Sequence, residues 1–354
     1  MKFLARGVVA AFVMFCALPA FSQAVGSLDF FDGEVQISRA NQVIDAWTLG
    51  FGEALFEGEV VETGPTGSAE FTFAEAVGAT MVIRSNTAYT VTVRNGSAAG
   101  SETEAGVDLL FGRVRVVTDG LRTNRSLNVR SGAVVAGVRG TEFDVMTSPD
   151  GAVLVGTRSG VVSTSTPRGE QRVEPGTVVE VLSSGVMSSV SIPVERMDDY
   201  FDIWLELRTQ AFSANPVLFV QPYLERFDRL YNSFVSSAQR LAPFQERLEQ
   251  AAFRSDLSAS DAVNLRTQAA TVVIGSRGSL AQFEETYFTL VQLVGLMSDS
   301  DKSALPQNYR RLLDRFQRER NNALQAVAQT RYILGLYDMV DFDVLPGGST
   351  RQGL

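Results

Sequence analysis

Carboxylates are the side chains of this chain whose types and spacing could do chemistry. Adjacent pairs occur at Asp198-Asp199 and Glu284-Glu285, and a third pair is formed by Glu102 and Glu104. Two carboxylates that flank a glycosidic bond can hydrolyse it, one acting as the acid and the other as a base or nucleophile. The sequence pattern places the first two pairs on helix surfaces and the third in a loop, where solvated charge is the ordinary explanation. We therefore expect no catalytic residues.

Other reactive groups are scarce. The 354 residues include no histidine and a single cysteine, Cys16. A Ser-His or Cys-His pair is therefore excluded, as is a zinc site of the usual ligands. Asp299-x-Asp301 lacks the central glycine and the closing glutamate of a calcium loop, and no glycine-rich phosphate loop is present. The sequence predicts a non-enzymatic protein without metal or cofactor.

The first 24 residues have the layout of a signal peptide. Lys2 and Arg6 precede an apolar run over residues 7–18, and Ser22-Gln23-Ala24 offers small residues where a signal peptidase reads. The run is shorter than the roughly 20 residues of a membrane-spanning helix. We expect cleavage after this segment and a periplasmic mature chain. The alternatives are a retained anchor and a lipoprotein modified at Cys16.

The charge of the chain limits its partners. The formal net charge is −9, and removal of the cationic signal segment makes the mature chain more acidic still. An acidic protein is a poor ligand for nucleic acid and for anionic lipid. No later segment is long and apolar enough to span a membrane, so we expect no membrane span after signal cleavage. Disulfides are excluded once Cys16 is removed.

Residues 25–193 have the pattern of a β domain. They are rich in Gly, Val, Thr and Ser, and short stretches such as 69–73 and 114–116 alternate apolar and polar residues. Turn-forming dipeptides such as Asn95-Gly96 and Asp150-Gly151 separate these stretches. Many short strands without a helical stretch predict an all-β sandwich, barrel or solenoid.

Residues 194–344 change to helical periods. Apolar residues recur at alternating steps of four and three, which is the heptad pattern of packed helices. Pro243 should kink or split the first of these helices, and Ser258 with Asp261 suits the start of the next. We expect an antiparallel bundle or coiled coil with aromatic core positions, and a flexible tail at 345–354. The seams include Phe227, Tyr231, Phe234, Phe283, Tyr287 and Phe316.

The segment from Val138 to Val145 is the most specific motif of the chain. The apolar alternation before Gly140 is out of phase with the alternation through Phe143 and Val145. One extra residue at a β-bulge with glycine would reconcile the two phases. Arg139 would then leave the core and hold a turn. Without the bulge, a single alternation places Arg139 on the face of Phe143.

This motif resembles the Val-Arg-Gly-Thr-x-Phe-x-Val signature of FecR domains. Its members here are Val138, Arg139, Gly140, Thr141, Phe143 and Val145. Other segments resemble the family in the same order, namely Leu55–Gly64, Ser68–Phe73, Leu110–Val114 and Val155–Val161. The resemblance spans roughly 33–181 and covers nothing after Pro193. We therefore expect an α+β chain in separate domains: a solenoid- or sandwich-like all-β FecR domain at 25–193, followed by a long-helix bundle at 194–344.

The resemblance implies a function through contacts. FecR proteins carry a cytoplasmic anti-sigma segment, one membrane span, and a periplasmic part that senses an outer-membrane transporter. The FecR-like part here follows a signal segment, so only the periplasmic, partner-contacting role carries over. We expect an exported binding or signalling protein whose partner is a protein or the cell envelope. The alternative is a structural periplasmic component that assembles, with copies of itself or with partners, through its helices.

Overall fold

The computed structural model describes residues 24–39, 42–74, 77–95, 103–118, 125–138, 140–253 and 258–340. Five sequence predictions lie wholly or partly outside these ranges: the signal segment up to residue 23, the Asn95-Gly96 turn, Glu102, Arg139 and the tail at 345–354. Within the described ranges, no helix combines the length and hydropathy needed to cross a bilayer.

Two nine-stranded sheets make up the N-terminal part. Sheet A contains, in spatial order, β18 (Met187–Ser191), β17 (Thr177–Val181), β14 (Val153–Ser159), β13 (Glu142–Thr147), β10 (Arg113–Thr118), β7 (Ala79–Ile83), β6 (Ser68–Phe73), β1 (Ala24–Asp32) and β4 (Glu53–Phe56). Sheet B contains β16 (Gly169–Val173), β15 (Val162–Thr166), β12 (Val134–Val138), β11 (Arg125–Ser131), β9 (Thr103–Phe111), β8 (Thr87–Asn95), β5 (Val60–Thr63), β2 (Val35–Arg39) and β3 (Gln42–Asp45). Neighbouring strands are antiparallel, except that β9 and β11 are parallel.

The two sheets face each other across one hydrophobic core. Inward positions alternate along each strand, as in β7, where Met81 and Ile83 are fully buried. Side chains from both sheets meet there, with Phe71 of sheet A contacting Tyr89 of sheet B at a ring separation of 6.3 Å. The all-β prediction is confirmed, and the arrangement is a sandwich.

Gly140 lies where the chain crosses from sheet B to sheet A. It connects β12 to β13 and has a φ of +71°, a conformation that glycine adopts without steric cost. The inward faces of the two sheets point in opposite directions, so the alternation of buried and outward residues shifts by one position where the chain passes from β12 to β13. This crossing accounts for the change of phase seen in the sequence. A bulge within one strand, which the sequence suggested, is not what produces it.

The C-terminal part is helical. Its helices are α1 (Met197–Ala214), α2 (Pro216–Leu241), α3 (Gln245–Phe253), α4 (Ala259–Leu296), α5 (Asp299–Ala304) and α6 (Gln307–Met339). Pro243 lies in the short 3-10 turn Ala242–Phe244 that separates α2 from α3, so the predicted break is confirmed. Ser258 caps α4 by accepting a hydrogen bond from the backbone N–H of Asp261, also as predicted.

The heptad seams form the core of this bundle. Phe283 of α4 stacks on Phe234 of α2 with ring centroids 4.3 Å apart, and Phe227 meets Phe316 of α6 edge-on at 5.1 Å. The Tyr231 hydroxyl donates to Glu319 at 2.7 Å. Ser237 also contacts Ser276, and α4 meets α6 through the pairs Tyr287–Arg320 and Glu284–Arg331, so α4 is antiparallel to both α2 and α6, as expected for a helical bundle. The aromatic seam positions serve this chain's own core.

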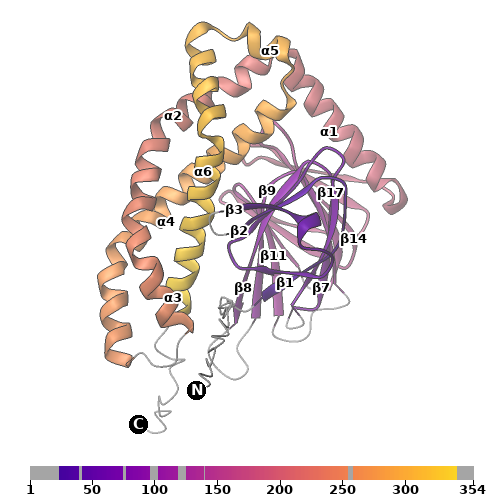
Figure 1. The fold of residues 1–354 in the computed structure, drawn as a ribbon. Helices are drawn as coiled ribbons and strands as arrows, with labels where there is room; N and C mark the ends of the chain where they lie inside the picture. The colour runs from indigo at the N-terminus through magenta and orange to yellow at the C-terminus, as the bar shows by residue number, and fades with distance from the viewer. Residues whose placement is uncertain are drawn as a thin grey trace, which may run out of the picture.

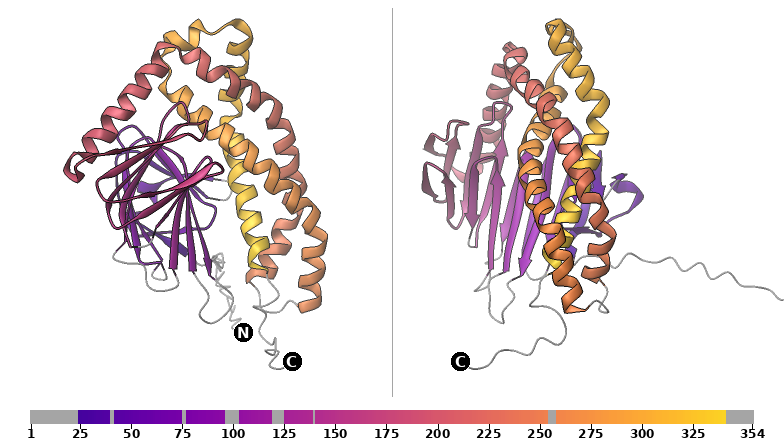
Figure 2. Two further views of the ribbon diagram at one scale, coloured as in Figure 1. Left: turned by 180° about the vertical axis from the view of Figure 1, so that it is seen from behind. Right: turned by 90° about the vertical axis from the view of Figure 1, so that its left-hand side faces the viewer.

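The helices straddle the sandwich as an arch (Figures 1 and 2). Helix α1 lies on the outer face of sheet A, where Phe201 and Trp204 pack on Leu154 and Val178. The bundle covers the outer face of sheet B, where Phe111 belongs to the same buried cluster as the helices. Helices α1 and α2 meet at an elbow, with Phe212 and Phe219 5.7 Å apart. Because both parts share buried surface, the division into separately folding domains stays a prediction.

Candidate functional site

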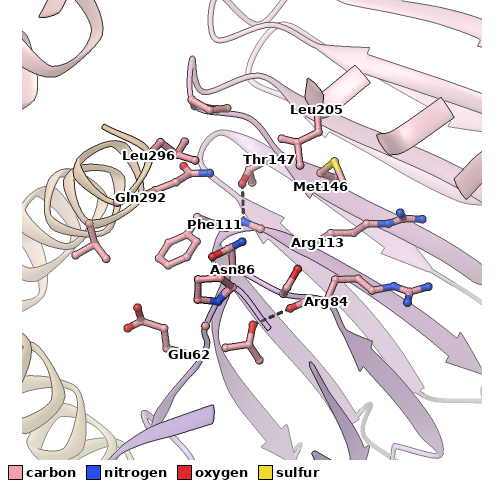
Figure 3. Close-up of a pocket in the computed structure, with 18 of the residues that line it drawn as sticks. Glu62, Arg84, Asn86, Phe111, Arg113, Met146, Thr147, Leu205, Gln292 and Leu296 are labelled. Atoms are coloured by element: carbon pink, nitrogen blue, oxygen red, sulfur yellow. Dashed lines mark hydrogen bonds between the residues drawn. The ribbon is translucent and has the colours of Figure 1, made fainter. Parts of the chain in front are cut away.

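A cleft of about 540 Å³ lies between the end of the sandwich and the two sides of the arch. Its floor is formed by sandwich turns at residues 63–65, 84–86, 111–113 and 146–149. Leu205 of α1 lines one side, Gln292 and Leu296 of α4 line the other, and Arg320 of α6 is also part of the lining. Figure 3 shows Gln292 and Leu296 extending from a helix towards the floor residues Phe111 and Thr147. We call this space the arch cleft.

A second cavity continues the arch cleft along the bundle. It measures about 700 Å³ and shares Thr147 and Gln292 with the first. Sandwich turns at 131–133, 148–151 and 182–185 line it opposite Glu284 and Phe288 of α4. The two cavities therefore adjoin, and a ligand that spans both would contact both parts of the chain.

Threonine side chains hold the floor turns in place. Thr63 Oγ1 accepts from the backbone N–H of Thr87 at 3.0 Å, and Thr87 Oγ1 accepts from that of Arg113 at 3.0 Å. Thr147 Oγ1 accepts from the N–H of Gly112 at 2.9 Å. Gly112 has a φ of +93°, and a Cβ on it would lie 2.5 Å from the carbonyl oxygen of Asn86. The floor is thus closely packed and fixed before any ligand arrives.

An arginine–carboxylate network fixes α1 beside the cleft. Asp144, fully buried on β13, accepts from Arg113 at 2.9 Å and from Arg158 at 2.8 Å. Asp198 of α1 then pairs with Arg113, Arg115 and Arg158 together. Because these arginines come from two strands of sheet A, one helical carboxylate ties α1 to the sheet. Phe201 adds a ring 4.5 Å from the Arg113 guanidinium carbon.

The network determines the protonation of Asp198. Partial burial alone would raise the pKa of Asp198, but the charges of Arg113, Arg115 and Arg158 outweigh it and hold that pKa below its ordinary value. The carboxyl group therefore stays ionised at neutral pH and is a poor general acid. Its neighbour Asp199 pairs with Arg196 on the exposed side of the same turn.

The second carboxylate pair is also bound to arginines. Glu284 pairs with Arg331 at 2.6 Å, and Glu285 lies 3.5 Å from Arg226. Burial raises the pKa of Glu284, an effect that Arg331 only partly opposes. The third pair lies outside the described side chains. Within the described residues, no three His, Cys, Asp or Glu side chains gather to hold a metal ion. Both described pairs thus contact arginines, and the cleft lining offers hydrogen bonds, charges and apolar contacts.

The signature residues lie next to the cleft but do not line it. Phe143 and Val145 are buried in the sandwich core. The backbone of Thr141 is held by Thr118, whose Oγ1 accepts from its N–H at 2.7 Å. Val138 ends β12 and Gly140 forms the crossing described above, whereas Arg139 is outside the described residues. Where described, these residues shape the scaffold, and it is their neighbours Met146 and Thr147 that face the ligand space.

Residues 59–163 match the protein family described as FecR protein. This chain contains a FecR domain. The match includes the Val138–Val145 motif and confirms the family predicted from it. It also includes all four floor turns of the arch cleft, whereas the helices that form the sides lie outside it.

Two solved structures are also similar to this chain. Both are crystal structures, at 1.65 Å and 2.50 Å resolution, of a candidate anti-sigma factor from Parabacteroides distasonis ATCC 8503. Each is 15% identical with a TM-score of 0.33, and each alignment covers 40% of this chain. The aligned part covers 64% of one solved chain and 63% of the other, a little under two thirds of each. No curated protein matches this chain.

The sequence interpretation missed the network around Asp144 and Asp198. A signal was present, because Arg113 and Arg115 alternate with inward valines and so lie on the outer face of β10. Asp144 lies directly opposite Arg115 on the neighbouring strand. Charged residues on the outer face of a sheet usually indicate that this face is exposed to solvent. The sequence alone did not reveal that α1 covers the outer face of sheet A.

Proposed function

We propose that this chain is an exported, non-enzymatic FecR-domain protein with a regulatory or signalling role, which acts by binding a protein or cell-envelope partner in the arch cleft. The observation that carries the proposal is the composition of the cleft. Its floor belongs to the FecR domain and its sides to the helices, so a ligand there contacts both parts at once.

The lining of the cleft supports recognition of a polypeptide. Apolar side chains such as Phe111, Met146 and Leu296 alternate with arginines and carboxylates, including Arg84 and Glu62. Binding surfaces of this kind combine apolar contact with a few directional polar groups. Asp198 and Glu284, which line the two cavities, are already paired with arginines, and this favours a binding role for them over a catalytic one.

The placement of the aromatic seams favours this role over a structural one. If the helices assembled with copies of themselves through the heptads, the seam residues would lie on a free face. Phe227, Phe234 and Phe283 are instead buried among α2, α4 and α6. Self-association through these residues would require the bundle to open.

Export is part of the proposal. The first described strand, β1, begins at Ala24, which is the residue after which we expect cleavage. Cleavage there removes only the first residue of β1 and leaves the rest of the described sandwich in the mature chain. N-terminal sequencing of the protein released by osmotic shock should begin at Val25, and a sequence beginning at Met1 would refute cleavage.

Site-specific photocrosslinking tests the cleft. A photoreactive residue in place of Gln292 should give one discrete adduct in living cells, because this position faces both cavities. The control is the same residue in place of Ile274, which is 71% exposed on the same helix and outside the cleft. Identical adducts from both positions, or none from Gln292, would contradict the proposal. Turnover of a polysaccharide or peptide, abolished by Asp198→Asn or Glu284→Gln, would establish an enzyme instead.

A further inference from the structure

A second surface, far from the arch in the sequence, exposes aromatic rings. Phe30 of β1, Trp47 of the short 3-10 turn Ala46–Thr48, and Phe51 before β4 are 52%, 53% and 59% exposed. Leu49 lies between Trp47 and Phe51 in sequence and is also exposed. We call these four residues the aromatic patch. It lies outside the family match and outside the arch cleft.

The rings of the aromatic patch are held in fixed orientations. Phe30 and Phe51 stack with centroids 5.8 Å apart and planes 9° apart. Trp47 Nε1 donates to the carbonyl oxygen of Gly33 at 2.8 Å. Phe31, which is buried in the core, contacts Trp47 at 4.9 Å and Phe51 at 4.8 Å. Rings that are already held in place lose little conformational entropy when a ligand binds. Exposed apolar side chains gathered in one patch are typical of a binding surface.

Carboxylates surround the rings. Asp29 and Asp32 are exposed on β1 beside Phe30, and Glu70 lies directly opposite Phe30 on β6. Asp45 caps the turn that carries Trp47. The only basic residue among the described residues 24–56 is Arg39, whose guanidinium already pairs with Glu53 and Glu59. The patch is thus aromatic and acidic at once.

Cations lie over aromatic rings elsewhere in this chain. Arg113 lies over Phe201, Arg208 over Trp204, and Arg315 over Tyr231. Among the described residues, no arginine or lysine side chain lies over a ring of the aromatic patch in this way. From this combination of free rings and a carboxylate rim, we infer that the aromatic patch binds an arginine- or lysine-bearing segment of a partner protein.

Charge favours a cationic protein segment over a second copy of the chain or an anionic lipid surface. A second copy of the chain carries a net charge of −9 and would be repelled by the acidic rim, as would an anionic lipid surface. A guanidinium or ammonium group gains from both features, because it is attracted to the ring faces and to the carboxylates. The inference does not depend on the arch cleft, so failure of the crosslinking experiment leaves it intact.

A peptide titration tests the inference on the full mature chain. The probe is a fluorescently labelled peptide in which arginines alternate with glycine and serine, and the control peptide carries neutral citrulline at each arginine position. Fluorescence anisotropy should show binding of the arginine peptide that weakens with added salt. The citrulline peptide should bind at least about five-fold more weakly, which corresponds to one cation–π or ion-pair contact.

Matched variants locate the binding surface. Phe51→Ala and Glu70→Gln should each weaken the arginine peptide about five-fold. Ile274→Ala and Asp314→Asn, which change an exposed apolar residue and an exposed acid on the bundle, should have no effect. Because Glu70 is exposed, its variant should fold even if Phe51→Ala does not. Equal binding of the citrulline peptide, or unchanged affinity in Glu70→Gln, would overturn the inference.

Discussion

Asp198 illustrates how single residues of this chain connect its two parts. It lies on the first turn of α1, yet its carboxylate pairs with three arginines of sheet A. Helix α1 has no side-chain hydrogen bond at its N-cap, so this network and the apolar contacts of Phe201 hold its start. The side of the arch cleft is therefore positioned by an ion-pair network.

Asp198→Asn should lower the free energy of unfolding by about 1 kcal/mol at neutral pH, the scale of an ion pair that water partly screens. The pKa of Asp198 is lower in the folded state than its ordinary value of 3.8. The ionised group therefore stabilises the fold above that value, and the contribution is lost as pH falls through the folded pKa. Urea unfolding of both proteins should give free energies of unfolding that converge as the pH falls below 3.8. The control is Asp199→Asn, whose side chain is 65% exposed; an equal loss there would refute the role of the network.

Gly140→Val should be strongly destabilising. The φ of +71° is a conformation that a β-branched residue does not readily adopt. We expect a loss of about 2 kcal/mol in chemical denaturation. Gly140→Asn should lose less, because asparagine tolerates this region. If valine and asparagine behaved alike, the backbone would not be the reason.

At the scale of elements, the hydrophobic period predicted what packs inward but not what packs on the outside. The steps of four and three identified Phe227, Phe283 and Phe316 as core residues, and each is buried. Strand alternation identified the inward face of β13 in the same way. The role of Asp144 on the outer face of β13 could not be predicted, because this residue is buried beneath arginines of sheet A and α1, and α1 begins 53 residues later in sequence. Contacts between distant elements leave no local period, so the arch and its cleft were not predicted.

Phe283→Ala should destabilise the bundle by about 4 kcal/mol, since it removes a fully buried ring that contacts Phe227 and Phe234. Thermal unfolding followed by circular dichroism at the helical band provides the measurement. Ile274→Ala changes an exposed residue of the same helix and should cost less than about 0.5 kcal/mol. If Phe283→Ala left stability intact and abolished partner binding, the seam would serve a partner instead of the bundle.

At the scale of the whole molecule, the sandwich and the helices share buried surfaces on both outer sheet faces. Phe111 of sheet B lies in the cluster of the bundle, and Met146 of sheet A lies beneath α1. Arg320 of α6 adds an ion pair to Glu62 at 3.6 Å. The chain thus contains two kinds of secondary structure that are joined by interfaces on opposite faces of one sandwich.

The fragment from Val25 to Pro193 tests the division of the chain. It should give a β-type circular dichroism spectrum without substantial helix. Because it leaves Phe111 and Met146 uncovered, it should melt below the full mature chain and bind a hydrophobic dye. A substantial helical signal would refute the all-β assignment, and an unchanged melting temperature would show that the interfaces add no stability.

The central claim is that a partner occupies the arch cleft, and filling the cleft tests it most directly. Gly295 of α4 lines the cleft, and a Cβ on it would meet no atom within 4 Å. Gly275 of the same helix is equally open but lies outside the cleft lining. A Cβ therefore fits at either position, and the melting temperature of each tryptophan variant shows whether the protein is folded.

The measurement is the yield of the adduct from the photoreactive residue at Gln292 in these two backgrounds. We predict that Gly295→Trp abolishes the adduct, because the indole occupies the space that the partner needs, and that Gly275→Trp leaves it unchanged. An undiminished adduct in a folded Gly295→Trp protein would contradict the claim.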